Sequence, residues 1–400
     1  MSLPDTADVI IVGGGILGLS AAWHLTRSST GARVLVLERN GLATAATAQA
    51  AALMTSARPD AATAALVADT YAAIPRLEDE TGESLDLNRV GTLHVAASPA
   101  STAALAAMAG GAERLDGGQA ARLAPWLDAD AVTAAWFAPD DGYLDPARLA
   151  NAYARAARRR GAVIRTGVAV HRLVVTAGRV MGVETDRGRV SAGAVVLACG
   201  AWSNVLAATA GVGLPASPVR SEYWITDRSP LYPRTAPVTI LPDAGAYARP
   251  ELGALLFGLR GATTIAADPR TLPDDATGFG AGDPWETLAA GAERLIRLVP
   301  SVGTIGLAHY VAGLSTYTPD GHFVVGPVAG VAGLVAVTGC CGAGIAASSG
   351  LGRAAAATVL GETPPADLSA FDPGRFGTVD PFDPAFLDRC AAARSGKTTG

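Results

Sequence analysis

The sequence predicts an α/β fold, and three features of its 400 residues support that prediction. An apolar run at 9–12 enters a turn with glycines at 13, 15 and 18, and a helix-like stretch follows. A second apolar run at 34–37 ends in Glu38, twenty residues after the last glycine. A third run, at 194–198, is apolar throughout, as parallel strands buried on both faces are. We therefore expect a Rossmann-type domain with a dinucleotide-binding turn after its first strand.

Each residue of that turn has a physical role. Gly13 permits the tight turn, Gly15 lets the backbone approach a pyrophosphate, and Gly18 lets helix and strand pack closely. The first amides of the helix then hold the phosphates, while Glu38 accepts hydrogen bonds from a ribose. Glycine-rich turns are common, so the pattern is specific only because strand, helix, strand and acid stand around it in the required order.

Two helices are predicted in the first half of the chain. Residues 59–80 predict a helix, kinked at Pro75, with four large side chains on roughly one face. These side chains are Leu66, Tyr71, Ile74 and Leu77. A second helix begins at Asp145, a good N-cap before Pro146, and ends at the arginines before Gly161. Cations suit a helix C-terminus, so we interpret this arginine run as part of the helix end and not as a binding patch.

Strands and two further helices account for most of the remaining chain. The predicted strands cover 89–97, 162–165, 168–175, 180–185, 189–191, 194–198, 222–226, 255–259 and 333–337. An amphipathic helix is expected over 282–299, and a helix of small residues from about 344 to 360. From 363 a proline-rich tail is expected to wrap the surface or to be partly disordered.

Composition excludes several classes of function. Half of the residues are apolar, enough for two domains with a large core. The net charge of −5, without a basic block, argues against a nucleic-acid partner. No run is long enough for a membrane span, and the apolar run at 9–22 holds the glycine turn, so we do not interpret it as a signal peptide. Cysteines 199, 340, 341 and 390 lack metal-ligand and disulfide spacing, which favours a cytoplasmic protein without a metal.

A second glycine cluster, at 339–350, also follows an apolar run and opens a predicted helix. It fits a loose dinucleotide pattern at Gly342, Gly344 and Ala347, but no further crossover and strand follow it. We therefore interpret it as completing the first site, with a second helix N-terminus directed at the same cofactor. One dinucleotide held from both ends of the chain is the simplest interpretation.

Over nearly its whole length the sequence resembles the D-amino-acid oxidase (DAO) superfamily of flavoproteins, in its sarcosine oxidase, dimethylglycine dehydrogenase and glycine oxidase branch. The segments that carry the resemblance are IIVGGGILGLSAAWHL with Glu38, GAVIRTGVAVHRL, VVLACGAWS, PVRSEYWIT, AYARPELGALLFGLR, AGLSTYTPDGHFVVGPV and VTGCCGAGIA. The resemblance implies a discontinuous FAD-binding domain (1–85, 145–215 and 310–365). It also implies an inserted α+β substrate domain with a mixed antiparallel sheet (86–144 and 216–309), followed by a C-terminal tail (366–400).

The resemblance also implies which residues bind FAD. The AMP half is expected to contact Gly13, Gly15, Ile16, Leu17, Gly18 and Glu38, with Arg39 beside the adenine. The loop at the pyrophosphate and flavin contributes Thr44, Thr47, Ala48 and Gln49, and a helix cap is the alternative role for Thr47. Val170 is expected at the adenine, Gly200 and Trp202 at a strand end, and Gly344 with Ile345 at the flavin pyrimidine. The cysteine that anchors flavin in sarcosine oxidases falls near Gly313, which predicts noncovalent FAD.

The sequence departs from the family pattern at the substrate carboxylate. Glycine-oxidase-like members have arginines where this chain has Ser315 and Gly342, and sarcosine oxidases have a lysine near Ala346. A carboxylate in an apolar pocket needs a cationic partner. Either another arginine serves, or the substrate is not a simple amino acid.

Three residues remain as catalytic candidates. Tyr247 aligns with a family tyrosine at the substrate carboxylate, Arg249 follows it by two residues, and Arg260 lies near the place of an oxygen-activating lysine. The structural alternative for each arginine is a salt bridge. Weaker candidates are Tyr223, His309 and Tyr317.

The resemblance implies oxidation of the C–N bond of a small amine or amino acid by hydride transfer to flavin N5, giving an imine that hydrolyses. A secondary or N-methyl amine is the favoured substrate, and oxygen or an electron carrier is the oxidant. The alternatives are oxidation of a D-amino acid, a 2-hydroxy acid or a biosynthetic intermediate, and a noncatalytic FAD-binding subunit of a larger complex. The sequence leaves open a homo-oligomer or a partner subunit.

Overall fold

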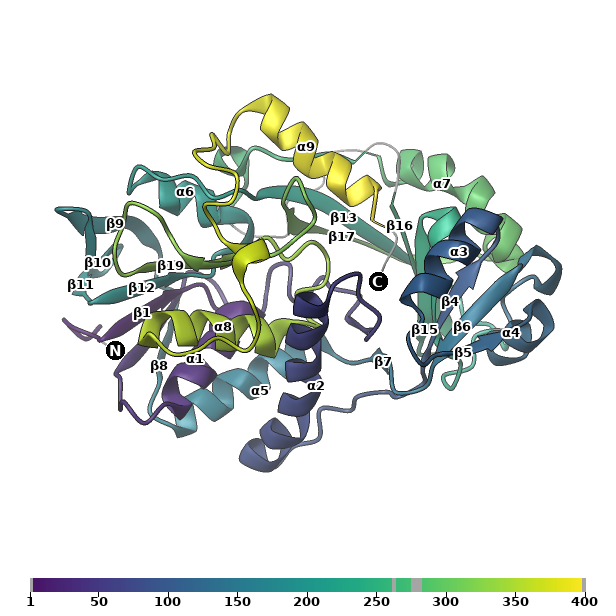
Figure 1. Cartoon of the computed structure of the whole chain (residues 1–400), viewed down its shortest axis with the longest axis horizontal. Helices are drawn as coiled ribbons and strands as arrows, with labels where there is room; N and C mark the ends of the chain where they lie inside the picture. Colours follow the sequence, from purple (N-terminus) through teal and green to yellow (C-terminus); the bar gives the residue numbers. More distant parts are fainter. Residues whose placement is uncertain (1–2, 261–263, 275–282, 398–400) are drawn as a thin grey trace.

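A six-stranded sheet carries the glycine-rich turn. The computed structural model describes residues 3–260, 264–274 and 283–397 (Figure 1). In order across the sheet the strands are β18 (Val324–Pro327), β19 (Leu334–Thr338), β12 (Ala194–Leu197), β1 (Val9–Val12), β2 (Val34–Glu38) and β8 (Val163–Thr166). All neighbours are parallel except β18, which is antiparallel to β19. The predicted α/β fold with a Rossmann-type FAD-binding domain is confirmed.

Four helices form the layer on one face of this sheet (Figure 1). They are α1 (Ile16–Arg27), α2 (Ala61–Thr81), α5 (Pro146–Arg159) and α8 (Ser348–Leu360). One of them, α2, packs on α5 and α8. In β1, Val9 and Ile11 face the core that these helices form. A Cβ at Gly352 of α8 would lie 2.2 Å from the Ser20 hydroxyl of α1, so the glycine permits a close contact between the two helices. This contact brings α1 and α8, which are far apart in the sequence, side by side.

A small antiparallel sheet and a short helix cover the opposite face. The sheet consists of β9 (Val170–Thr176), β10 (Arg179–Thr185) and β11 (Gly188–Ser191), and the helix is α6 (Ser203–Ala208). Ile10 and Val12, the alternate residues of β1, lie in this second core with Leu173. Both faces of β1 are therefore buried, as its apolar sequence predicts.

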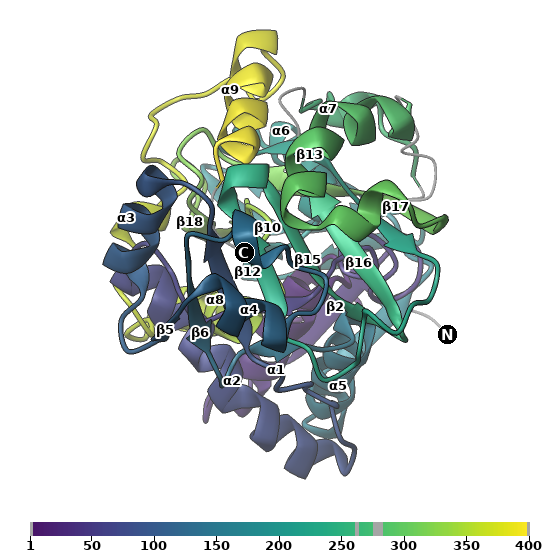
Figure 2. The same cartoon turned by 90° about the vertical axis from the view of Figure 1, so that its right-hand side faces the viewer.

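The second large sheet has eight strands and a separate core. In order they are β17 (Leu307–Tyr317), β13 (Ser217–Thr226), β16 (Ala254–Leu259), β15 (Ala246–Glu251), β14 (Val238–Leu241), β4 (Thr92–Ala96), β6 (Ala134–Ala138) and β5 (Glu113–Leu115). Only the β14–β4 pair is parallel. The helices around this sheet are α3 (Pro99–Met108), α4 (Gly117–Leu123) and α7 (Pro284–Leu298) (Figure 2). A two-stranded sheet, β3 (Leu53–Met54) and β7 (Gly142–Tyr143), completes the strands described here.

Two segments in the last sixty residues differ from what the sequence predicts. The helix expected from about 344 begins only at Ser348, and residues 341–347 form turns. The tail expected from 363 contains a helix, α9 (Pro384–Ser395), which packs on β13 and β17. It lies along the upper edge of the molecule in Figure 1.

Other expectations stand close to the observed elements. Asp60 caps α2 and Asp145 caps α5, each through its carboxylate. Residue 282, where the amphipathic helix was expected to begin, lies outside the described residues. The predicted domain boundary at 310 falls inside β17 (Leu307–Tyr317). The division into domains remains a prediction. Among the described residues, no helix has the length and apolarity needed to cross a membrane.

Candidate active site

A cavity of about 710 Å³ separates the two large sheets. On one side it is lined by residues that follow the carboxyl ends of β1, β2 and β12, which is where α/β sheets bind ligands. On the other side it is lined by Tyr223 of β13, Tyr247 of β15 and Gly313–Tyr317 of β17, together with Arg260. The cavity therefore has one wall formed by the glycine turn and the strand ends, and a second wall that contains tyrosine and arginine side chains.

The glycine turn after β1 has the geometry that its sequence predicts. Gly13 has φ +113°, and a Cβ there would lie 2.3 Å from the Ala198 carbonyl oxygen. A Cβ at Gly18 would lie 2.1 Å from the Gly13 carbonyl oxygen, so Gly18 packs inside the fold and does not line the cavity. Gly15, Ile16 and Leu17 do line it, and they place the first amides of α1 at the cavity wall.

Glu38 and Arg39 follow β2 at the cavity wall. The Glu38 carboxylate accepts hydrogen bonds from the Gly14 amide at 2.6 Å and the Asn40 amide at 2.8 Å. The Arg39 guanidinium stacks over the Trp202 ring at 4.1 Å and pairs with Asp274 at 2.9 Å. Glu38 therefore fixes the glycine turn as well as offering oxygens to a ligand.

The loop after β2 is only partly inside the site. Thr44, Thr47 and Gln49 line the cavity, whereas Ala48 is exposed and lies outside it. The Thr47 hydroxyl accepts a hydrogen bond from the Ile16 amide at 3.1 Å, so Thr47 caps the start of α1. The helix cap, the alternative role expected for Thr47, is thus present.

The remaining predicted cofactor residues all line the cavity: Val170, Gly200, Trp202, Gly344 and Ile345. Gly344 and Ile345 belong to the turns before α8. The buried N-terminus of α8 is not part of the cavity wall, in contrast to the expectation of a second helix N-terminus at the cofactor. Backbone of the 340–346 segment takes that place.

The catalytic candidates separate into two groups. Tyr247 and Arg260 both line the cavity, and the Arg260 guanidinium lies 5.8 Å from the Tyr247 ring. Removal from water raises the pKa of Tyr247 and lowers that of Arg260. Arg249 lies outside the cavity: its guanidinium donates to the Ala51 carbonyl at 2.9 Å and pairs with Glu251. The salt bridge given as the structural alternative therefore applies to Arg249.

The weaker candidates also separate. Tyr223 and Tyr317 line the cavity, and burial raises the pKa of Tyr317 to about 12. His309 is exposed on β17 and does not line it. Tyr317 therefore belongs to the same wall as Tyr247 and Arg260.

Four cations of the cavity wall were missed in the sequence: Arg58, Arg270, Arg394 and Lys397. Arg394 and Lys397 come from the end of α9 and the residues after it. The signal that predicts α9 is present in the chain, since Asp383-Pro384 repeats the Asp145-Pro146 pattern that begins α5. The positions of the absent family cations, Ser315, Gly342 and Ala346, also line the cavity.

Little charge comes from Glu222 and from the cysteine thiols of the cavity wall. Glu222 lines the cavity but is buried in an ion pair with Arg220 at 2.8 Å and accepts from the Tyr310 hydroxyl at 2.6 Å. Burial raises the pKa of Cys199 and of Cys340 to about 12, so both remain thiols. No group of three or more potential metal ligands occurs in the part of the chain that the structure describes.

The fold and this cavity are those of a dinucleotide-binding α/β protein, with a second wall of tyrosine and arginine side chains across the cavity from the glycine turn. A model of the DAO family, described as FAD dependent oxidoreductase, matches residues 8–358. This chain belongs to that family.

Curated relatives and a solved structure agree with this assignment. The chain is 31% identical to 4-methylaminobutanoate oxidase (formaldehyde-forming) of Paenarthrobacter nicotinovorans, over 94% of this chain and 46% of that protein. It is 28% identical to mitochondrial dimethylglycine dehydrogenase of Mus musculus, over 93% of this chain and 44% of that protein. Glycine oxidase of Geobacillus kaustophilus superposes with a TM-score of 0.78 at 25% identity, covering 93% of this chain and 99% of that one. The chain thus spans less than half the length of these two curated relatives.

FAD is the cofactor of this family, and the cavity residues fit it. Trp202 Nε1 is buried, and among the described residues it has no hydrogen-bond partner. Gly15 has ordinary extended backbone (φ −77°), so its lack of a Cβ serves close approach and not backbone freedom. Gly313 has no side chain with which to bond a flavin, in agreement with noncovalent attachment.

Proposed function

We propose that this chain oxidises the C–N bond of a secondary or N-methyl amino acid. The observation that carries the proposal is the polar wall formed by Tyr247, Arg260 and Tyr317, which faces the dinucleotide-binding side of the same cavity. FAD, when bound, supplies the acceptor for the hydride that leaves the carbon beside the amine nitrogen. The resulting imine is hydrolysed by water.

The names of the relatives support this substrate class. 4-Methylaminobutanoate and dimethylglycine both carry an N-methyl amine and a carboxylate. A guanidinium has five donors, and the Lys397 carbonyl accepts from one of those of Arg260 at 2.8 Å. We assign Arg260 to binding of the substrate carboxylate through charge-assisted hydrogen bonds.

The wall also favours the reactive form of the amine. Arg260 and Arg394 make this end of the cavity positive, which disfavours an ammonium ion and so favours a neutral amine with its lone pair available. Tyr247 and Tyr317 have raised pKa values and remain protonated at neutral pH. These phenols therefore orient the substrate as hydrogen-bonding groups and do not serve as bases.

Two features of the setting belong to the proposal. The four cysteines are free thiols, in agreement with a reducing compartment such as the cytoplasm. Oxygen or an electron carrier serves as the final oxidant.

Anaerobic mixing of the purified holoprotein with a substrate panel tests the proposal. N-methyl amino acids are expected to bleach the visible flavin band and to release formaldehyde. Bleaching only by D-amino acids or 2-hydroxy acids would show that the chain catalyses a different oxidation. A flavin that no member of the panel reduces, even though FAD is bound, would indicate a noncatalytic subunit.

A further inference from the structure

Lys397 is the only lysine in the chain, and it lines the cavity. It follows α9, whose start is capped by the Asp383 carboxylate and whose side chains Phe386 and Cys390 pack in a small core with Tyr317 and Val219. Packing of α9 therefore places the Lys397 side chain at the cavity wall that also holds Tyr247, Arg260 and Tyr317.

The surroundings of the Lys397 ammonium leave room for a ligand. Its Nζ donates to the Cys341 carbonyl at 2.8 Å, which takes one of three available N–H donors. A Cβ at Gly342 would lie 3.2 Å from Lys397 Nζ and 2.8 Å from the Tyr317 hydroxyl. Gly342 therefore keeps side-chain atoms away from a point that both polar groups approach.

The positive charges near Lys397 favour binding of an anion. Within the described ranges, no carboxylate forms an ion pair with Lys397, Arg260 or Arg394. Burial and the nearby charges of Arg260, Arg58 and Arg394 lower the pKa of Lys397 well below its usual range. Clustered cations of this kind are unfavourable without a counter-charge, and a bound carboxylate supplies one.

We propose that Lys397 is a second substrate-binding cation beside Arg260: its ammonium group, with the Tyr317 hydroxyl, contributes to binding the carboxylate of the amino-acid substrate. It replaces, from the far end of the chain, the family cations that are absent at Ser315, Gly342 and Ala346. This inference rests on the proposed function, because it assumes a substrate with a carboxylate.

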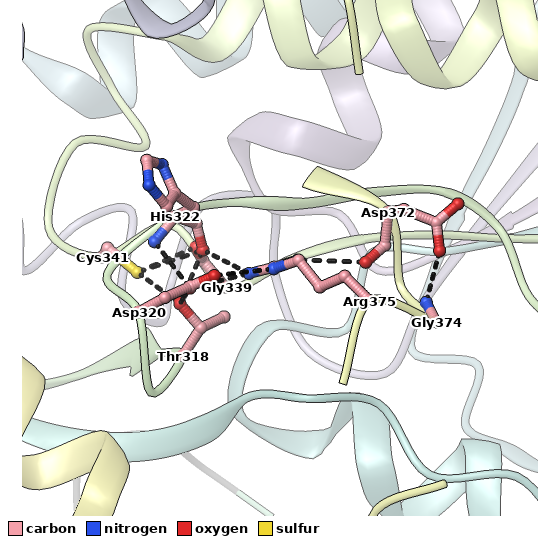
Figure 3. A network of polar contacts seen from close by, with 8 residues as sticks. All are labelled: Thr318, Asp320, His322, Gly339, Cys341, Asp372, Gly374 and Arg375. Carbon is pink, nitrogen blue, oxygen red and sulfur yellow. Dashed lines mark hydrogen bonds and ion pairs between the residues drawn. The ribbon is translucent and has the colours of Figure 1, made fainter. Parts of the chain in front are cut away.

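A hydrogen-bond network links the segment around Arg375 to Asp320, His322 and Cys341 (Figure 3). Arg375 pairs with Asp320 at 2.8 Å and donates to the His322 carbonyl at 3.2 Å. The Thr318 hydroxyl contacts Asp320 and the Cys341 thiol, and the Cys341 carbonyl is the acceptor for Lys397. The tail before α9 is thus tied to the turn whose backbone contacts the ammonium group.

Ligand titration of the holoprotein tests Lys397 without turnover. Propionate is expected to perturb the visible flavin spectrum, whereas neutral propionamide is not. In Lys397→Met the dissociation constant for propionate should rise at least about tenfold, as loss of a charge-assisted hydrogen bond predicts, and Lys397→Arg should restore part of the affinity. Arg389→Met, an exposed site on the same helix, is the matched control and should bind propionate as the wild type does. Equal affinity of wild type and Lys397→Met would overturn the proposal.

A second measurement needs no variant. Because the chain has one lysine, an amine-selective acylating reagent followed by peptide mass mapping reports on that side chain alone. Propionate is expected to slow the acylation of Lys397 and propionamide to leave it unchanged; an unchanged rate with propionate would count against the assignment. Neither measurement requires catalysis, so failure here is distinct from failure of the amine panel to bleach the flavin.

Discussion

At the residue scale, the glycines of the β1–α1 turn have different tasks. Gly13 and Gly18 allow the backbone of the turn to pack, since a Cβ at either would meet a carbonyl oxygen at 2.3 or 2.1 Å. Gly15 has no such close neighbour: a Cβ there would lie 3.4 Å from the Thr47 hydroxyl. We therefore expect the ligand, and not the fold, to require glycine at this position.

Substitution separates these tasks. Gly15→Ala should leave the unfolding free energy of the apoprotein within about 0.5 kcal/mol of wild type and weaken FAD binding at least about tenfold. Gly18→Ala should destabilise the apoprotein by about 3 kcal/mol, because the added methyl group overpacks the turn. Chemical denaturation and FAD titration measure both effects. Equal loss of stability in the two variants would show that Gly15 is also structural.

A buried histidine makes stability depend on pH. His94 of β4 is 4% exposed, and among described residues neither ring nitrogen has a hydrogen-bond partner. Burial, with the nearby charge of Arg58, lowers its pKa to about 4. The unfolded chain binds a proton near pH 6.5 and the native chain does not, so stability is present above that pH and is lost as the pH falls toward 4.

His94→Leu should remove this loss, which amounts to about 3 kcal/mol over that interval. Denaturation at a series of pH values is expected to show a shallower acid slope, with the slope from the partly buried His24, whose pKa is also lowered, remaining. His309→Asn, at an exposed site, should keep the wild-type slope. An unaltered slope in His94→Leu would mean that this imidazole is not held neutral.

At the element scale, helix ends were the most predictable features. Asp145 before Pro146 defined the start of α5 because a carboxylate cap and a first-turn proline act locally. The same pair, Asp383-Pro384, begins α9, but the prolines around it led to a prediction of an irregular tail. The late start of α8 and the position of Arg249 depend on tertiary contacts, namely the partly buried turns at 341–347 and the Ala51 carbonyl, which no local pattern contains.

The link between the tail and β17 is testable through Asp320. Burial opposes its ionisation, but hydrogen bonds from Arg375 and the His322 amide outweigh this and lower its pKa. Its contribution is therefore present above the unfolded-state pKa and is lost as the pH falls through the lower native value. Asp320→Asn should cost about 1 kcal/mol at neutral pH and progressively less in acid.

Thermal unfolding at neutral and acid pH measures this difference. Asp388→Asn, at an exposed position of α9, serves as the control and should unfold as wild type does. If Asp320→Asn lost the same stability at every pH, the ionised carboxylate would not be the stabilising group.

At the scale of the whole molecule, residues from distant segments meet in one cavity. The sequence could predict the nucleotide wall, because it is built from a local strand–turn–helix motif with Glu38 at a fixed distance. The polar wall of Tyr247, Arg260 and Tyr317 is built from β15, the end of β16, β17 and the segment after α9. These elements are close because the strands pair in one sheet and because α9 packs on it. Tyr247, Arg260 and Tyr317 could be named by resemblance, whereas Lys397 required the three-dimensional structure.

The central claim is that both ends of the chain enclose a single noncovalent FAD. Its most direct test is to purify the protein, titrate the apoprotein with FAD and precipitate the complex with acid. We expect a yellow protein that binds one FAD per chain and releases it into the supernatant. A colourless protein that takes up no FAD would contradict the account, and colour retained in the pellet would contradict noncovalent attachment.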